Sequence, residues 1–323
     1  MVLVLSEDDV GSVLDLPELV DVVEEALVKQ AAGEAERPER PHFPVGAGLD
    51  GDEPLGTGLA MPAYVHGDPL YATKLVGIHE DNADRGLPTI HAQIVLTDAR
   101  TGEPVALLAG TTVTNARTGS IGAAAVRALA PDAATLGVVG AGAQARWQTR
   151  AIDTVVSLSE VRVYSPSDSR EACAADLRGE GIPVEAVDSP AAAVGSVDVV
   201  VTATTAGEPV FPPDALAPGT LVVAVGAFDA ETQELAPAVV EGAAEVFADV
   251  PEEAAETGDF LGTDLGAGDL VPMGATLAEG YERNPAPDVL VVASVGSATL
   301  DAAAGGTLYE RAREAGVGTD VSL

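Results

Sequence analysis

The chain contains little cysteine, little lysine and no long apolar run. Its one cysteine, Cys173, has no second cysteine with which to form an internal disulfide. No apolar run approaches the roughly 20 residues needed to span a bilayer, and residues 1–10 lack the basic flank of a signal peptide. These absences predict a cytoplasmic protein in a reduced compartment, with no membrane segment.

The histidines also exclude a class of site. No group of cysteine and histidine has the spacing of metal ligands, so we predict no structural zinc and no other metal. The four histidines are scattered through predicted loops and strands, at His42, His66, His79 and His91.

Cationic residues are outnumbered by acidic ones, 16 against 51, which gives a formal net charge of −35. The acids are spread along the chain, and this charge argues against nucleic acid as a partner. Such a surface could bind a cationic partner. We favour instead a solvated acidic surface in a salt-rich cytoplasm, where screening weakens self-repulsion, as in a salt-adapted organism. Lysine occurs only at Lys29 and Lys74.

The chain is long and apolar enough for two domains, with 323 residues, 47% of them hydrophobic, and a mean hydropathy of +0.23. The first hundred residues predict a sheet with helices at one edge, with strands at 58–64, 71–78, 89–97 and 105–109. Residues 35–54 are rich in proline and glycine and predict an exposed crossing segment. From residue 135 onward strands and helices alternate, which predicts a doubly wound parallel sheet of the α/β class.

Residues 135–150, TLGVVGAGAQARWQTR, predict a buried strand, a glycine turn and the start of a helix. Gly140 permits the tight turn, Gly142 lets the backbone approach a phosphate, and Ala145 lets the helix pack on the strand. The N–H groups at the start of that helix would face the anion. We therefore predict a dinucleotide site.

The end of the next predicted strand bears on the choice between NAD and NADP. An NAD site usually places an acidic residue there, to bind the ribose 2′-hydroxyl. Ser165 stands at this position, followed by Ser167 and Arg170, which could accept a 2′-phosphate, while Asp168 would oppose it. The same residues could instead form an ordinary helix cap. We predict NAD or NADP, with NADP favoured.

Lys74 lies in a strongly apolar strand, PLYATKLVGIHEDN. Burial would lower its pKa into a range useful for proton transfer, so Lys74 is the first candidate catalytic residue. It could also extend to solvent from a strand edge. Arg117, near the start of a helix, and Arg40, in the crossing segment, could each hold a carboxylate in a bidentate fork. Taken singly, each is better interpreted as a surface arginine than as a site residue. Together with Lys74 they predict a substrate that bears a carboxylate.

These segments resemble one family, the ornithine cyclodeaminases and mu-crystallins, which also includes archaeal alanine dehydrogenases and cyclic ketimine reductases. The matching segments run in family order from about residue 37 to the end of the chain. They are ERPH, GLAMPAYV, the Lys74 strand, RGLPTIHAQIVLTDARTGEPVALLAGTTVTNARTG, GVVGAGAQA, QELAP and ASVGSATLDAAAGGTLYERAREAGVGT.

The resemblance implies a homodimer whose dimerisation and substrate domain is built from both chain ends, with a Rossmann domain inserted between them. We expect residues 1–115 and 297–323 in the first domain and 116–296 in the second. By matched position, Arg40, Lys74 and Arg117 would hold the substrate carboxylate, with Lys74 also polarising the reacting group or moving a proton. The residues expected at the cofactor are Thr89, Arg117, Thr118, Gly140, Gly142, Ala143, Gln144, Ser165, Thr204, Gly226 and Ser294.

The chain departs from the family in VGAFDAETQEL. Ornithine cyclodeaminases and the archaeal alanine dehydrogenase carry Asp and Lys where this chain has Phe228 and Thr232. Asp229 is displaced by one residue and, in an extended segment, would face the opposite side. A local backbone rearrangement could return Asp229 to the site.

The missing carboxylate disfavours cyclodeamination of ornithine and favours simple hydride transfer. We therefore predict an NAD(P)-dependent oxidoreductase that acts on a small α-amino or α-imino acid, as a ketimine reductase or an alanine dehydrogenase. Ornithine cyclodeaminase is the first alternative. The second is a protein that binds the cofactor without catalysis, and the presence of Lys74 counts against it.

Overall fold

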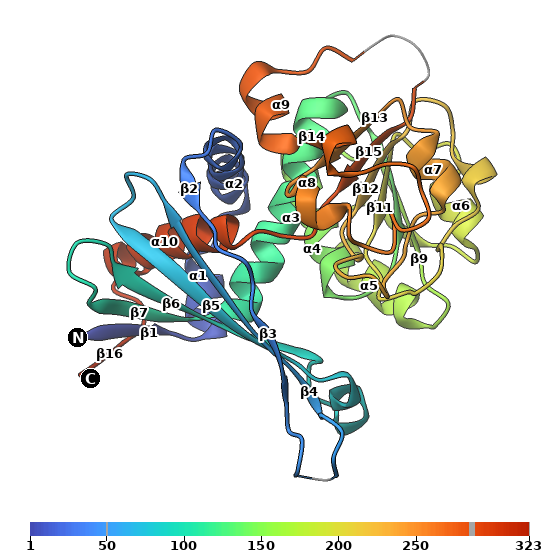
Figure 1. Cartoon of the computed structure of the whole chain (residues 1–323). Coiled ribbons are helices and arrows are strands. Elements are labelled where there is room, and N and C mark those ends of the chain that lie inside the picture. The colour runs from blue at the N-terminus through green and yellow to red at the C-terminus, as the bar shows by residue number, and fades with distance from the viewer. Residues whose placement is uncertain (50, 284–287, 323) are drawn as a thin grey trace. The chain divides into compact units, whose positions relative to one another are not determined.

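The computed structural model describes residues 1–49, 51–283 and 288–322. The chain divides into two compact units. Unit 1 contains residues 1–15, 32–117 and 298–323, and unit 2 contains residues 16–31 and 118–297. Figure 1 labels the elements of both units.

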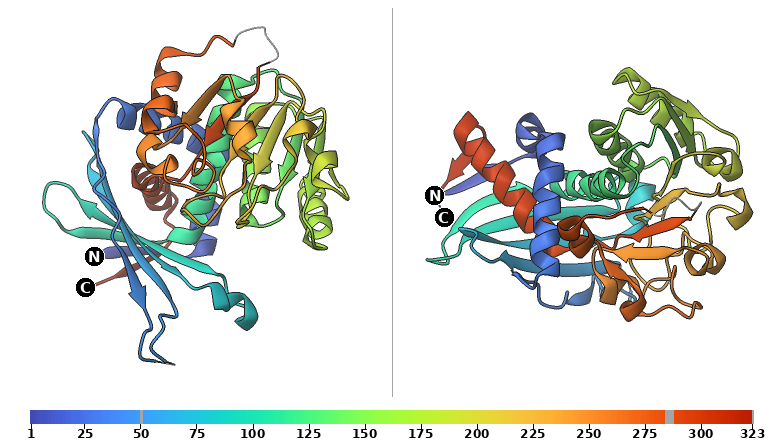
Figure 2. Two further views of the ribbon diagram at one scale, coloured as in Figure 1. Left: turned by 45° about the vertical axis from the view of Figure 1, so that its right-hand side comes forward. Right: turned by 90° about the horizontal axis from the view of Figure 1, so that it is seen from above.

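Unit 1 is built on one mostly antiparallel sheet, in the order β16-β1-β7-β6-β5-β4-β2, with β3 also paired to β4. The two chain ends lie side by side (Figure 2) because β1 pairs with β16. The strands are β1 Val2–Leu5, β2 Ala35–Glu36, β3 His42–Val45, β4 Gly56–Val65, β5 Leu70–Ile78, β6 Ile90–Asp98, β7 Pro104–Ala109 and β16 Thr319–Val321.

Burial alternates along the central strands of this sheet, as the period of two requires. On β7, Ala106 and Leu108 are buried while Leu107 is exposed. The buried face packs against helix α10, Ala298–Ala315, and α1, Glu7–Val13, also contacts α10 (Figure 1). Ser6 caps α1 through a hydrogen bond with the N–H of Asp9.

Unit 2 contains a parallel sheet in the order β10-β9-β8-β11-β12-β15-β13-β14. The chain runs outward from β8 to β10 and then returns to β11 beside β8, so a switch point lies between β8 and β11. The α/β doubly wound fold predicted for this part of the chain is confirmed. The strands are β8 Thr135–Val139, β9 Glu160–Tyr164, β10 Val184–Ala186, β11 Val199–Thr202, β12 Leu221–Ala224, β13 Glu245–Ala248, β14 Val271–Pro272 and β15 Leu290–Ala293.

Helix α3, Gly110–Leu129, begins in unit 1 and ends in unit 2. The remaining α-helices are α2 Leu16–Ala31, α4 Ala143–Val155, α5 Ser169–Gly179, α6 Pro190–Val194, α7 Pro237–Glu241, α8 Pro251–Ala254 and α9 Met273–Glu279, and the 3₁₀ turns are η1 Glu80–Arg85, η2 Pro213–Ala215 and η3 Ala267–Asp269.

The domain prediction is corrected at α2, which we had placed in the first domain. This helix belongs to unit 2 because it packs tightly against α9. A side chain at Gly274 would collide with the carbonyl of Leu27, so glycine allows the two helices this close approach. Arg127 of α3 also pairs with Glu24 and Asp21 of α2.

Two further expectations differ from the structure. The segment expected to be a strandless crossing contains β2 and β3, because both add to the long edge strand β4. Arg117, which we had placed in the inserted domain, belongs to unit 1.

Candidate active site

Lys74 lies in the middle of β5, on the sheet face that α10 covers. It stands in one row with Met61 of β4 and Ile94 of β6. Both neighbours are buried, and the Lys74 side chain is itself only 3% exposed. The alternative that Lys74 extends to solvent is therefore wrong.

Asp301 of α10 supplies the counter-charge to Lys74. Its Oδ2 lies 2.5 Å from Lys74 Nζ, and its Oδ1 accepts a hydrogen bond of 2.9 Å from Arg117 Nε. Thr114 Oγ1 lies 3.4 Å from the same Oδ1. One buried carboxylate thus connects β5, α3 and α10 within unit 1.

The electrostatics of this cluster follow from its burial. Burial lowers the pKa of Lys74 from 10.5 to about 8; the charge of Asp301 opposes the shift, and Arg117 and Arg40 add to it. Burial alone would raise the pKa of Asp301, but Arg117 and Lys74 outweigh it, so this pKa is lowered. Asp301 is therefore ionised at neutral pH, and Lys74 can release a proton in a mildly alkaline range.

The structure thus brings together the three cations predicted from the sequence. Lys74 and Arg117 share Asp301, and Arg40 is near enough to affect the pKa of Lys74. The sequence analysis missed Asp301. The available signal was its isolation, because Asp301 is the one charged residue between Ala298 and Tyr309.

In unit 2, the glycine turn after β8 has the geometry that an anion site requires. Gly140 has a φ of +120°, and a Cβ there would lie 2.3 Å from the carbonyl oxygen of Ala203. Gly142 is the N-cap of α4, and a Cβ there would meet nothing within 4 Å. Ala145 is fully buried against the sheet. The turn therefore leaves backbone N–H groups open to a phosphate, which fits a dinucleotide.

A buried carboxylate holds together the loops that follow β11 and β12. Glu234 accepts hydrogen bonds from Thr202 Oγ1 at 2.7 Å, from the N–H of Thr204 at 2.6 Å and from the N–H of Gly226 at 2.8 Å. Burial raises the pKa of Glu234 to about 7, although these donors oppose the shift. The sequence analysis named Thr204 and Gly226 but not Glu234.

A second buried carboxylate, Asp259, holds the segment that carries Glu234. Its Oδ1 accepts hydrogen bonds from the N–H groups of Glu234 and Leu235, at 2.6 and 2.7 Å. Burial raises the pKa of Asp259 to about 6, against these two hydrogen bonds. Asp259 thus fixes the backbone at Glu234 and Leu235.

Ser294 follows β15, and its hydroxyl donates to Asp249 Oδ2 at 2.8 Å. The N–H of Gly296 donates to the same oxygen at 2.8 Å. Asp249 therefore fixes the loop after β15 much as Glu234 fixes the loops after β11 and β12.

At the end of β9, three serine hydroxyls lie together. Ser165 Oγ is 3.1 Å from Ser169 Oγ, and Ser167 Oγ is 2.8 Å from Ser169 Oγ. Arg170 Nη1 donates to the carbonyl of Ser165 at 3.0 Å, while its Nη2 lies 3.4 Å from Asp188. Asp168 is exposed at the start of α5.

The remaining predicted cofactor residues fall in both units. Thr89 lies in unit 1, where its carbonyl accepts a hydrogen bond from the N–H of His79. Ala143 and Gln144 occupy the first turn of α4 in unit 2. Thr118, buried in α3, accepts a hydrogen bond at its carbonyl from Gln148.

Within residues 1–49, 51–283 and 288–322, no cluster of three or more His, Cys, Asp or Glu could hold a metal ion. In the same ranges, no helix is both long and apolar enough to cross a membrane.

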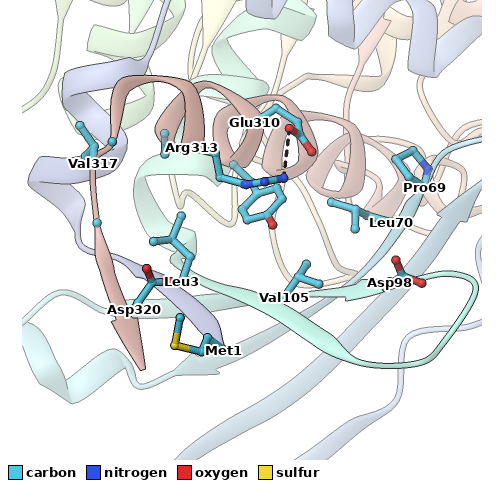
Figure 3. Close-up of a pocket in the computed structure, with 14 residues that line it drawn as sticks. Met1, Leu3, Pro69, Leu70, Asp98, Val105, Glu310, Arg313, Val317 and Asp320 are labelled. Atoms are coloured by element: carbon cyan, nitrogen blue, oxygen red, sulfur yellow. Dashed lines mark ion pairs between the residues drawn. The ribbon is translucent and has the colours of Figure 1, made fainter. Parts of the chain in front are cut away.

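A cavity of about 630 Å³ in unit 1 lies apart from the Lys74 cluster. Figure 3 shows it beside Leu3 of β1 and Val105 of β7, with Arg313 and Glu310 of α10 paired at 3.8 Å. None of its lining residues was predicted as a site residue.

The chain belongs to the ornithine cyclodeaminase/mu-crystallin family, whose model matches residues 2–316. Among its relatives, alanine dehydrogenase from Archaeoglobus fulgidus is 31% identical over 99% of this chain and 98% of that protein.

Two solved structures are similar over the full length. Δ1-pyrroline-2-carboxylate reductase from Thermococcus litoralis, in complex with NADH and L-proline, has a TM-score of 0.92 and 30% identity, covering 99% of this chain and 100% of that one. An archaeal alanine dehydrogenase dimer with bound NAD has a TM-score of 0.91 and 27% identity, covering 100% and 99% of the two chains.

The charge balance of the Lys74 cluster generates a test of stability. Lys74→Met leaves the neutral pair of Arg117 and Asp301, whereas Asp301→Asn leaves two buried cations unbalanced. At pH 7 we expect Asp301→Asn to lower the free energy of unfolding by about 3–5 kcal/mol, and Lys74→Met to lower it much less. Urea unfolding measures both; equal losses would contradict this charge balance.

The same variants carry a pH test. Between about pH 8 and 10.5 Lys74 binds a proton in the unfolded chain but not in the folded chain, so it adds stability as pH rises through this window. The stability of the wild type relative to Lys74→Met should therefore increase between pH 7 and pH 10. A constant difference would show that the pKa of Lys74 is not lowered.

Proposed function

We propose that this chain is an NAD(P)-dependent oxidoreductase that transfers hydride to or from the α-carbon of a small α-amino or α-imino acid. The reaction is of the ketimine reductase or alanine dehydrogenase type. The observation that carries this proposal is the buried cluster around Lys74. Lys74 and Arg117 share the buried carboxylate of Asp301, and Arg40 lies near enough to lower the pKa of Lys74. On a chain with a net charge of −35, this gathering of three cations suits a substrate carboxylate.

Each residue of the cluster then has a part in the reaction. Arg40 and Arg117 orient the substrate carboxylate, which fixes the α-carbon for transfer. Lys74, with its pKa near 8, polarises or protonates the nitrogen next to that carbon. Asp301 keeps the ammonium of Lys74 in place through their ion pair. A bound nicotinamide dinucleotide supplies or accepts the hydride, and Gly140, Gly142 and the start of α4 would hold its pyrophosphate.

The turn after β12 weighs against cyclodeamination of ornithine. Asp229 Oδ1 accepts hydrogen bonds from the N–H and the hydroxyl of Thr232, at 2.9 and 2.8 Å, and from the N–H of Glu231 at 3.2 Å. The carboxylate of Asp229 is therefore occupied by hydrogen bonds within its own turn, residues 229–232. Phe228, at the position where the cyclodeaminases carry Asp, is 46% exposed.

The assay follows reduced nicotinamide by its absorbance, with Δ1-pyrroline-2-carboxylate or with pyruvate and ammonia. We expect the wild type to oxidise the cofactor, and Lys74→Met to lose turnover by at least about a hundredfold while it still binds the cofactor. Equal loss of binding and turnover would assign Lys74 a structural role.

A parallel assay gives the protein NAD and ornithine. Proline and ammonia formed with no net change in absorbance would identify an ornithine cyclodeaminase and overturn the proposal. A wild type that binds the cofactor but turns over none of these substrates would instead be a non-catalytic binding protein.

Within this activity we propose a preference for NADP over NAD. Supporting it are the serine hydroxyls at Ser165, Ser167 and Ser169, with Arg170 beside them, where an acidic residue would select NAD. Hydroxyl and guanidinium groups can donate to a 2′-phosphate.

Ser165→Asp tests this preference. The new carboxylate would repel a 2′-phosphate and accept from a 2′-hydroxyl, so the ratio of kcat/KM for NADPH to that for NADH should fall about tenfold or more. Ser159→Asp, the same change just before the opposite end of β9, is the matched control and should leave the ratio unchanged. A ratio that is insensitive to Ser165→Asp would contradict the preference.

We also propose that two copies of the chain pair through the outer face of the sheet in unit 1. This face, opposite Lys74 and α10, carries Phe43, Leu75 and Leu107, which are 50%, 45% and 36% exposed. Their cross-strand partners place them on one side of the sheet. An exposed apolar sheet face favours a protein partner, and the similar archaeal alanine dehydrogenase is a dimer.

Light scattering tests the proposed pairing. The wild type should have the mass of a dimer, and Leu75→Asp should shift it to the monomer because a charge would be buried at the interface. Leu261→Asp, at an exposed leucine of unit 2, should remain a dimer. If Leu75→Asp also remains a dimer, a different surface makes the contact.

A further inference from the structure

Glu234 accepts hydrogen bonds at the carboxyl ends of two neighbouring strands of unit 2, β11 and β12. Thr202 is the last residue of β11, Thr204 lies two residues later, and Gly226 lies two residues after the end of β12. Glu234 is fully buried and accepts one hydrogen bond from each of these three residues. Glu234 therefore connects the carboxyl ends of the adjacent strands β11 and β12.

The loops it holds pack closely against each other. A side chain at Gly226 would lie 2.2 Å from the carbonyl oxygen of Thr204 and 2.5 Å from Glu234 Oε1. Glycine at 226 therefore allows the close approach of Thr204 and Glu234, and the N–H of Gly226 donates to Glu234.

The position of these loops indicates which part of a dinucleotide they serve. In a doubly wound sheet the ligand lies across the switch point, at the carboxyl ends of the strands. Strands β8, β9 and β10 form one mononucleotide half, with Gly140 and Ser165 at its strand ends. Strands β11 and β12 begin the other half, on the far side of the switch point, where the nicotinamide nucleotide belongs. All three donors to Glu234 lie in this second half.

Asp259 gives this arrangement a rigid support. By accepting the N–H groups of Glu234 and Leu235, it fixes the backbone from which the Glu234 carboxylate extends. Burying a carboxylate is costly, and here the cost is offset by three donors aimed at its two oxygens. Replacing the charge would therefore loosen the loops without removing an element of the fold.

We propose that Glu234 is a positioning residue for the nicotinamide half of the dinucleotide: by fixing the backbone of Thr204 and Gly226, it sets where the nicotinamide nucleotide lies. This inference rests on the proposed function, since it requires that unit 2 bind a nicotinamide dinucleotide. Glu234 acts through the two loops and has no assigned contact with the cofactor.

The test compares two ligands that share the whole ADP-ribose part. NADH also contains the nicotinamide ring, and ADP-ribose lacks it, so the ratio of their dissociation constants isolates the binding of that ring. For Glu234→Gln, which keeps the shape but replaces one accepting oxygen by an amide NH2 that cannot accept, we expect the ratio of Kd for NADH to Kd for ADP-ribose to rise about tenfold. Calorimetry gives both constants, and kcat should fall with the same variant.

Thr202→Val serves as a second variant if Glu234→Gln does not fold, because it removes one donor with little change in shape. Its ratio should rise about threefold. Thr220→Val is the matched control. Thr220 is also buried, but it precedes β12, and its hydroxyl donates to the carbonyl of Val197. Its ratio should equal that of the wild type.

The outcomes separate the two proposals. An unchanged ratio in folded Glu234→Gln, or in Thr202→Val if the first does not fold, overturns the positioning role. An equal loss of both ligands does the same, since it would make Glu234 a support of the whole unit. A wild type that binds none of NADH, NADPH and ADP-ribose overturns the proposed function itself.

Discussion

The buried ion pairs of Asp301 are the constraint on which unit 1 depends. Lys74 and Arg117 cannot be buried side by side without an opposite charge, and Asp301 on α10 supplies it at 2.5 and 2.9 Å. Helix α10 therefore does more than cover the sheet. It holds the Lys74 ammonium in place, so the contact that stabilises the fold also positions the cations that we propose bind the substrate carboxylate.

Few of the acidic residues are buried, and each of those either accepts backbone hydrogen bonds or pairs with buried cations. Among the described residues four are buried, namely Glu234, Asp249, Asp259 and Asp301. Asp301 pairs cations, whereas the other three accept backbone N–H groups in loops of unit 2. The solvated acids set the net charge, while these four determine where loops and cations lie. A count of charges therefore says little about the site, and burial separates the two populations.

The sequence predicted local features well and long-range partners poorly. The glycine turn at Gly140, the alternation of strands and helices, and the apolar setting of Lys74 are all read within a few residues. Asp301 was not predicted as a site residue, because helical periodicity shows which residues share a face but not which strand that face contacts. The assignment of α2 to unit 2 depends on its contact with Gly274. The role of Glu234 depends on Gly226 and Thr204, which are 8 and 30 residues away in the chain. Tertiary contacts decided each of these.

The return of the chain to its first strand has a consequence for biosynthesis. Arg117 and Asp301 are 184 residues apart, and nearly all of unit 2 is translated between them. Synthesis proceeds from the N-terminus, so unit 2 can fold while the central strands of unit 1 still lack α10 and β16. During that interval Asp301, their shared counter-ion in the folded unit, has not yet been made, so Lys74 and Arg117 stay hydrated until α10 covers this face of the sheet. In the nascent chain, unit 2 can therefore be complete before unit 1.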